Sequence, residues 1–134
     1  MKLYALTYIV FLIAFVGADF VWLGWAGNAI YRPAMGDMAL SGFRAAPAVV
    51  FYLLYAAGAV ALAVVPGATA GSWVGAGARG VLYGLCAYGT YDLTNQATLR
   101  HWSTTLTVID MIWGALLTGA AAALAVVAGR QLPA

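Results

Sequence analysis

The sequence predicts an all-α integral membrane protein that folds as a four-helix bundle. Hydrophobic residues occupy 65% of the 134 positions and charged residues only 7%, whereas soluble domains carry about 25% charged residues. Several apolar stretches also reach the length of about 20 residues that a helix needs to cross the hydrocarbon core. Lipid covers such a surface more readily than water does, so we predict one transmembrane domain over residues 1–134.

Four apolar segments are long enough to be membrane-spanning helices. We predict helices over about residues 3–25, 45–65, 80–99 and 104–128. Helix is the expected form because every backbone polar group of a lone segment in lipid must be satisfied within that segment. The first, third and fourth segments each contain one aspartate, and the second contains no charged residue.

Proline, glycine and polar residues mark the breaks between these helices. Residues 28–44 form the long connection, within which Pro33 at a first helical turn predicts a short interfacial helix. Residues 66–78 are rich in glycine, alanine and serine and predict a turn that begins at a proline. Residues 100–103 predict a tight connection. Short connections place neighbouring helices antiparallel.

The start of the fourth helix and the tryptophans give two further expectations. Ser103 or Thr104 is the expected N-cap of the fourth helix. With four antiparallel helices, Trp73 should lie at the membrane face opposite Trp25 and Trp102. The positive charges are divided equally between the two faces, so the sequence does not decide the orientation in the membrane.

Three aspartates are predicted to lie at one depth. Asp19, Asp92 and Asp110 are each six or seven residues from the helix end that meets the connections 28–44 and 100–103. At a rise of 1.5 Å per residue, each carboxyl group lies roughly 9–10 Å below that face. We therefore expect the three to face the bundle interior in one layer.

The same layer is rich in aromatic and polar side chains. Asp and Trp are three residues apart on both the first and the fourth helix, and the third helix carries a polar stripe around its aspartate. Tyr52 and Tyr55 of the second helix lie near the same depth, and Arg100 is the expected cationic neighbour. The candidate binding residues are Asp19, Trp22, Tyr88, Tyr91, Asp92, Asn95, Arg100, Asp110 and Trp113.

Two interpretations of this layer remain open. An ionised aspartate in mid-helix costs about 2.5–3.5 kcal/mol on insertion scales, so such residues are usually functional. The alternative is a structural network in which the carboxyl groups accept hydrogen bonds from tyrosine, tryptophan and asparagine and determine how the helices pack. At a depth of roughly 9 Å both interpretations are physically reasonable.

Several functional classes receive no support. His101 is the only histidine and Cys86 the only cysteine, so we expect no metal site built on these residues within one chain. There is no phosphate-binding loop and no dinucleotide glycine motif, and no cofactor is expected. A net charge of +2 without a basic cluster argues against nucleic-acid binding.

Four motifs in order resemble a bacterial membrane family known as domain of unknown function 2177. They are Asp19-Phe-Val-Trp-Leu-Gly24, Phe51-Tyr-Leu-Leu-Tyr55, Tyr88-Gly-Thr-Tyr-Asp-Leu-Thr-Asn95 with Arg100 and Trp102 after it, and Ile109-Asp-Met-Ile-Trp-Gly114. The resemblance covers nearly the whole chain and implies a four-helix membrane protein of the bacterial inner membrane. It implies no activity, but the motif residues coincide with the predicted polar layer.

The sequence therefore leads to one preferred hypothesis and two alternatives. We expect a bundle that binds or transports a small solute, a lipid or a proton through a pocket of aspartate, tyrosine and tryptophan near one membrane face. The first alternative is an accessory or structural subunit of a larger membrane complex. The second is a lipid-modifying enzyme, which no nucleophile motif supports. Expected partners are membrane lipids and either a second copy or a larger membrane assembly.

Overall fold

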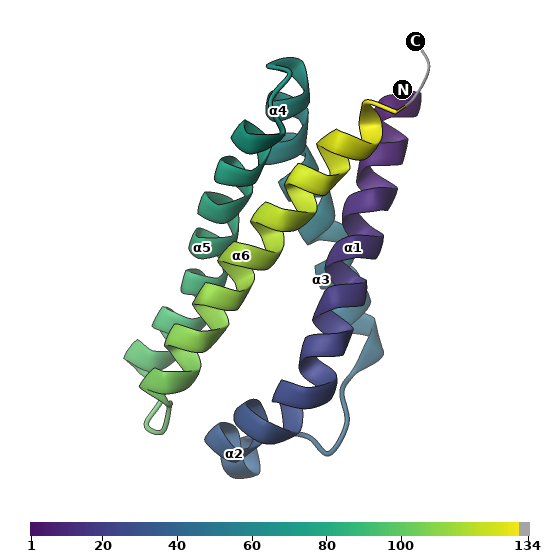
Figure 1. Cartoon of the computed structure of the whole chain (residues 1–134). Helices are drawn as coiled ribbons and strands as arrows, with labels where there is room; N and C mark the ends of the chain where they lie inside the picture. Colours follow the sequence, from purple (N-terminus) through teal and green to yellow (C-terminus); the bar gives the residue numbers. More distant parts are fainter. Residues whose placement is uncertain (132–134) are drawn as a thin grey trace.

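Helices account for nearly all of the chain in the computed structural model, which describes residues 1–131 (Figure 1). Helix α1 (Lys2–Ala26) continues through the π-helical turn η1 (Gly27–Tyr31) into α2 (Arg32–Met35) and the 3-10 turn η2 (Gly36–Met38). Helix α3 (Ala45–Ala59) continues through a second π-helical turn, η3 (Val60–Val64), into α4 (Val65–Thr69). Helices α5 (Trp73–Thr98) and α6 (Thr104–Gly129) complete the chain. Residues 1–131 contain no strand, in agreement with the predicted all-α class.

The helices run up and down between two ends of the bundle. Figure 1 shows the start of α1, the end of α6 and the α4–α5 turn at one end, which we call the terminal end. Helix α2 and the connection 99–103 lie at the other, which we call the loop end. Arg130 donates a hydrogen bond to the carbonyl of Gly71 and so ties the end of α6 to the α4–α5 turn. Trp73 begins α5 at the terminal end and Trp102 lies at the loop end, as the antiparallel order predicts.

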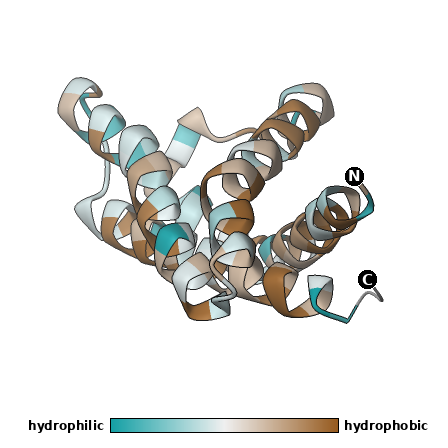
Figure 2. Cartoon of the chain, turned by 90° about the horizontal axis from the view of Figure 1, so that it is seen from above, coloured by the Kyte–Doolittle hydropathy of each residue, from teal (hydrophilic) through white to brown (hydrophobic). Residues whose placement is uncertain are grey.

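Three continuous helical segments are long and apolar enough to cross a membrane. They are Lys2–Met38, Ala45–Thr69 and Thr104–Gly129. Helix α5 is as long as α6, at 26 residues, but its glycines, threonines and amides make it less apolar. Its status as a fourth span stays a prediction. Most positions along the helices range from intermediate to hydrophobic, and strongly hydrophilic positions are few (Figure 2).

The prediction that the second helix ends at Pro66 is wrong. The helix runs through this proline to Thr69 because η3 precedes it and places Pro66 in the first turn of α4. A proline is tolerated in a first turn because its missing N–H group has no carbonyl to meet there. The irregular hydrogen bonding of the π-helical turn η3 allows the helix to continue through Pro66.

The actual break falls at residues 70–72. Gly71 adopts a left-handed conformation with φ of 65°, and Ser72 donates its N–H to the carbonyl of Gly67 at 2.8 Å, as in a Schellman cap. The Ser72 side chain then accepts from the N–H of Gly75 and starts α5. Helix α5 therefore begins at Trp73 rather than near residue 80 as predicted.

The other two breaks differ in how well they were predicted. The first helix does not end before Asn28 but continues through η1 to Met38, and only residues 39–44 are extended or irregular. Pro33 does lie in the first turn of the short helix α2. The connection before α6 is where it was predicted, and Ser103 caps that helix by accepting from the N–H of Leu106 at 3.1 Å.

Small residues bring α5 and α6 into close contact. A Cβ atom added to Gly80 would lie 2.8 Å from the carbonyl oxygen of Thr118, and one added to Gly84 would overlap the carbonyl oxygen of Gly114. Small-xxx-small spacing allows helix backbones to approach in this way. The close contact places the polar residues further along α5 against those of α6.

Candidate functional site

Asp19 of α1 is held by one residue from α3 and one from α6. Its side chain is buried, at 6% exposure. It accepts hydrogen bonds from the Tyr52 hydroxyl at 2.5 Å and from the Trp113 indole nitrogen at 3.0 Å. Both donors are neutral, so they satisfy the carboxyl oxygens but leave the charge of an ionised aspartate uncompensated.

Asp110 of α6 is held by the segment that follows α1. The Tyr31 hydroxyl of η1 donates to Asp110, and the same hydroxyl accepts from the indole nitrogen of Trp22 at 3.0 Å. Asp110 is also buried, at 6% exposure. The π-helical turn therefore places Tyr31 beside Asp110 of α6.

The two Asp-x-x-Trp pairs are connected crosswise. Trp113 follows Asp110 but donates to Asp19, whereas Trp22 follows Asp19 but reaches Asp110 through Tyr31. The indole rings of Trp22 and Trp113 stack at a centroid distance of 4.6 Å and an interplanar angle of 13°. The stack connects the hydrogen bond from Trp113 to Asp19 with the hydrogen bonds from Trp22 through Tyr31 to Asp110, so that they form one network.

Asp92 is the carboxyl group without a hydrogen-bond donor. It is fully buried, at 0% exposure, and neither of its oxygens has a donor among the described residues. Asp110 is its neighbouring acidic group, and two ionised carboxylates would both be acceptors and would repel each other. A proton or another positive charge must be present for the pair to be stable in a dry interior.

A cavity of about 420 Å³ opens beside these carboxyl groups. Asp19 and Asp110 both lie in its wall. The remaining lining is aromatic and apolar and comes from α1, η1, α3 and α5: Leu23, Tyr31, Phe51, Tyr52, Tyr55, Ala87, Tyr88 and Tyr91. The volume is within the range of about 300–1,000 Å³ that small-molecule sites occupy.

Most of the predicted layer is brought together in the structure. Asp19 and Asp110 line one cavity and Asp92 neighbours Asp110, while the rings of Trp22 and Trp113 stack on each other. Tyr88 packs directly over Gly114 and lines the cavity. Tyr91 also lines it and meets Trp102 edge-on at 5.7 Å. Whether these residues bind a ligand stays a prediction.

The expectation that Arg100 pairs with one of the carboxyl groups is wrong. Arg100 is exposed in the connection after α5, and the donors that the structure gives the aspartates of the layer are tyrosines and a tryptophan. A guanidinium group beyond the helix end remains hydrated at little cost. Asn95 lies partly buried on α5 and is not part of the cavity wall.

The sequence did not identify Tyr31 as a site residue. It falls in the segment predicted as a loop, and no periodicity connects it to Asp110. Phe51 and Leu23 lie in two of the family motifs but were not among the predicted site residues, and Ala87 is an apolar residue without a distinguishing signal. Tyr52 and Tyr55 were expected near the depth of the aspartates, and their hydroxyl groups contact Asp19 and Thr118 respectively.

The fold and the site define a helical membrane protein with a cluster of buried aspartates. Residues 4–127 match the family model described as "Predicted membrane protein (DUF2177)", and the chain belongs to this family. The resemblance seen in the four motifs is thereby confirmed, whereas the bacterial origin and the inner-membrane location stay predictions. No curated protein and no solved structure matches the chain.

Proposed function

We propose that this protein is a membrane-embedded binding or transport-type bundle whose cavity takes a small solute or a lipid headgroup. The observation that carries the proposal is the cavity of about 420 Å³ with Asp19 and Asp110 in its wall. Aspartates that served only in helix packing would be expected to lie against other side chains, with no cavity beside them.

The composition of the wall supports the same function. Ligand sites are mostly apolar and aromatic, with a few polar groups that orient the ligand. Ionisable residues within a membrane usually face the bundle interior and mark a substrate or ion path. The hydrogen bonds from Tyr31, Tyr52 and Trp113 hold the two wall carboxyl groups in defined positions, as a binding site requires.

A pocket-filling substitution tests the proposal. Ala87→Phe places a ring in the cavity without removing a polar group, and Ala120→Phe adds the same ring at an exposed position of α6. Native mass spectrometry of protein purified from membranes should show a bound molecule in the unchanged protein and in Ala120→Phe but not in Ala87→Phe. A bound molecule that persists in Ala87→Phe, or none in the unchanged protein, would contradict the proposal.

A further inference from the structure

The cavity has negative groups in its wall and no positive ones. Among the residues that line it, Asp19 and Asp110 are acidic, and none is lysine, arginine or histidine. Their hydrogen-bond donors are the neutral side chains of Tyr31, Tyr52 and Trp113. The site as built from protein atoms therefore lacks a positive charge.

Asp92 adds a third acidic group next to this site. Its carboxyl group is completely buried, has no donor among the described residues and neighbours Asp110, which lies in the cavity wall. Buried polar atoms in native structures are almost always satisfied, so this carboxyl group requires a partner such as a shared proton or a cation. A cation beside Asp110 would relieve the repulsion between the two carboxyl groups.

The aromatic wall indicates which kind of cation fits. Five tyrosines and one phenylalanine line the cavity, and their rings lie at different angles: Tyr55 and Tyr88 meet at 86°, and Phe51 and Tyr55 at 43°. The faces of aromatic rings attract cations, and cages of such rings recognise substituted ammonium groups. By contrast, no group of three or more acidic, histidine or cysteine residues among residues 1–131 is arranged to hold a metal ion.

The exposure of the wall indicates that the ligand also has an apolar part. Phe51 and Tyr91 line the cavity but are 43% and 48% exposed on the chain, so the cavity is open at its side. In a membrane this opening faces hydrocarbon or a neighbouring helix. A ligand that fills the site therefore presents its charged group to the carboxyl groups and its apolar part to the opening.

We propose that the cavity binds an organic ammonium ion that carries an apolar chain, with Asp19 and Asp110 as counter-ions and the tyrosine rings as the cage. This inference rests on the binding function proposed above and names its ligand class. The ammonium group belongs either to a lipid headgroup or to a free amphiphilic amine, since the two share the same chemistry.

Three matched probes test the charge requirement. Octyltrimethylammonium, octanol and octanoate are titrated at sub-micellar concentrations into the full chain in dodecyl maltoside, with tryptophan fluorescence as the readout because Trp22 and Trp113 adjoin the site. Only the ammonium probe should give a saturable change. Asp19→Asn and Asp110→Asn should each weaken its binding roughly tenfold, and Asp37→Asn, at an exposed position of η2, should leave it unchanged.

The outcomes separate the two proposals. Equal saturable binding of all three probes, unaffected by the asparagine variants but lost in Ala87→Phe, would overturn the ammonium inference and leave a binding pocket. No saturable binding of any probe would overturn both. If an asparagine variant does not fold, Ala87→Phe and Tyr88→Leu keep every carboxyl group and should still lose the ammonium probe.

A competition experiment distinguishes a lipid headgroup from a free amine as the ligand. Adding phosphatidylcholine to the micelles should displace the probe if a lipid headgroup is the ligand, and diacylglycerol serves as the control without an ammonium group. Displacement by phosphatidylcholine alone supports a lipid ligand, and a lack of displacement supports a free amine. Equal displacement by both lipids would contradict recognition of the ammonium group.

Discussion

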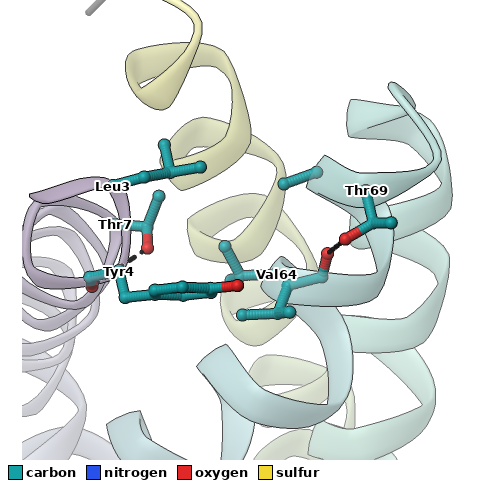
Figure 3. Close-up of a pocket in the computed structure, with 7 residues that line it drawn as sticks. Leu3, Tyr4, Thr7, Val64 and Thr69 are labelled. Atoms are coloured by element: carbon teal, nitrogen blue, oxygen red, sulfur yellow. Dashed lines mark hydrogen bonds between the residues drawn. The ribbon is translucent and has the colours of Figure 1, made fainter. Parts of the chain in front are cut away.

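The two ends of the bundle satisfy the hydrogen bonds of their polar side chains in different ways. At the terminal end, the Thr7 and Thr69 hydroxyl groups donate to the carbonyls of Tyr4 and Val65 within their own helical segments, beside a cavity of only about 100 Å³ (Figure 3). At the loop end, the hydrogen bonds of the aspartates cross between helices and surround a cavity of about 420 Å³.

This difference separates a packing region from a candidate site. A hydroxyl group bonded to its own helix needs no partner helix, so the terminal end can close over small residues. A carboxyl group bonded across helices is satisfied only when those helices are correctly placed. Close helix packing and the hydrogen bonds that cross between helices should therefore contribute most to stability, and four substitutions test this, from the largest expected effect to the smallest.

Gly84→Ala should have the largest effect on stability. The added Cβ would overlap the Gly114 carbonyl oxygen and lie 2.7 Å from the Thr118 hydroxyl oxygen. We expect a loss of about 3 kcal/mol in the free energy of unfolding, measured by denaturant titration in mixed micelles, because α5 and α6 must move apart. The control is Gly17→Ala, where a Cβ meets nothing within 4 Å and helix propensity should add up to about 1 kcal/mol. Equal effects of the two would contradict close packing of α5 on α6.

Tyr52→Phe should have the next largest effect. The substitution removes a donor from buried Asp19 and leaves it only Trp113. We expect a loss of about 2 kcal/mol because hydrogen bonds to charged groups contribute about 1.5–3 kcal/mol. Tyr8→Phe is the matched control between the same two helices, since its hydroxyl donates to the exposed Leu53 carbonyl and should cost about 0.5 kcal/mol. A larger loss of stability in Tyr8→Phe than in Tyr52→Phe would contradict the prediction that the hydrogen bond to buried Asp19 contributes more.

Asp92→Asn should stabilise the bundle by about 1 kcal/mol. The asparagine has nearly the same shape, removes a buried carboxyl group without a donor, and provides an N–H group for Asp110. Unfolding in mixed micelles measures the gain. Asp92→Leu provides the control, since it removes the charge but supplies no donor to Asp110. Destabilisation by the asparagine variant would show that Asp92 has a partner in the membrane and would weaken the argument for a missing cation.

Arg100→Ala should have the smallest effect, within about 0.5 kcal/mol, because the side chain is exposed and none of the aspartates accepts from it in the structure. The affinity for octyltrimethylammonium should also stay unchanged. A loss of 2 kcal/mol or more, on the order expected for a broken buried ion pair, would mean that Arg100 does reach the carboxyl groups.

Residue counting predicted that Asp19, Asp92 and Asp110 lie in one layer that faces the bundle interior. The structure buries all three and places Asp19 and Asp110 in one cavity wall, whereas their depth in a membrane stays a prediction. The same reasoning failed where backbone geometry departs from a regular helix. Pro66 and Asn28 looked like helix ends, but π-helical turns carry the chain past each position.

The sequence by itself determined the apolar helices, the family and the position of each aspartate along its helix, because these depend on hydrophobicity and on distance along one helix. The tertiary structure decided which partner each carboxyl group has. Nothing local shows that Trp113 bonds Asp19 rather than Asp110, or that Tyr31 returns to Asp110 after leaving α1. Those pairings depend on the rotation of each helix about its axis, which is set by close contacts such as that of Gly84 with Gly114 and Thr118.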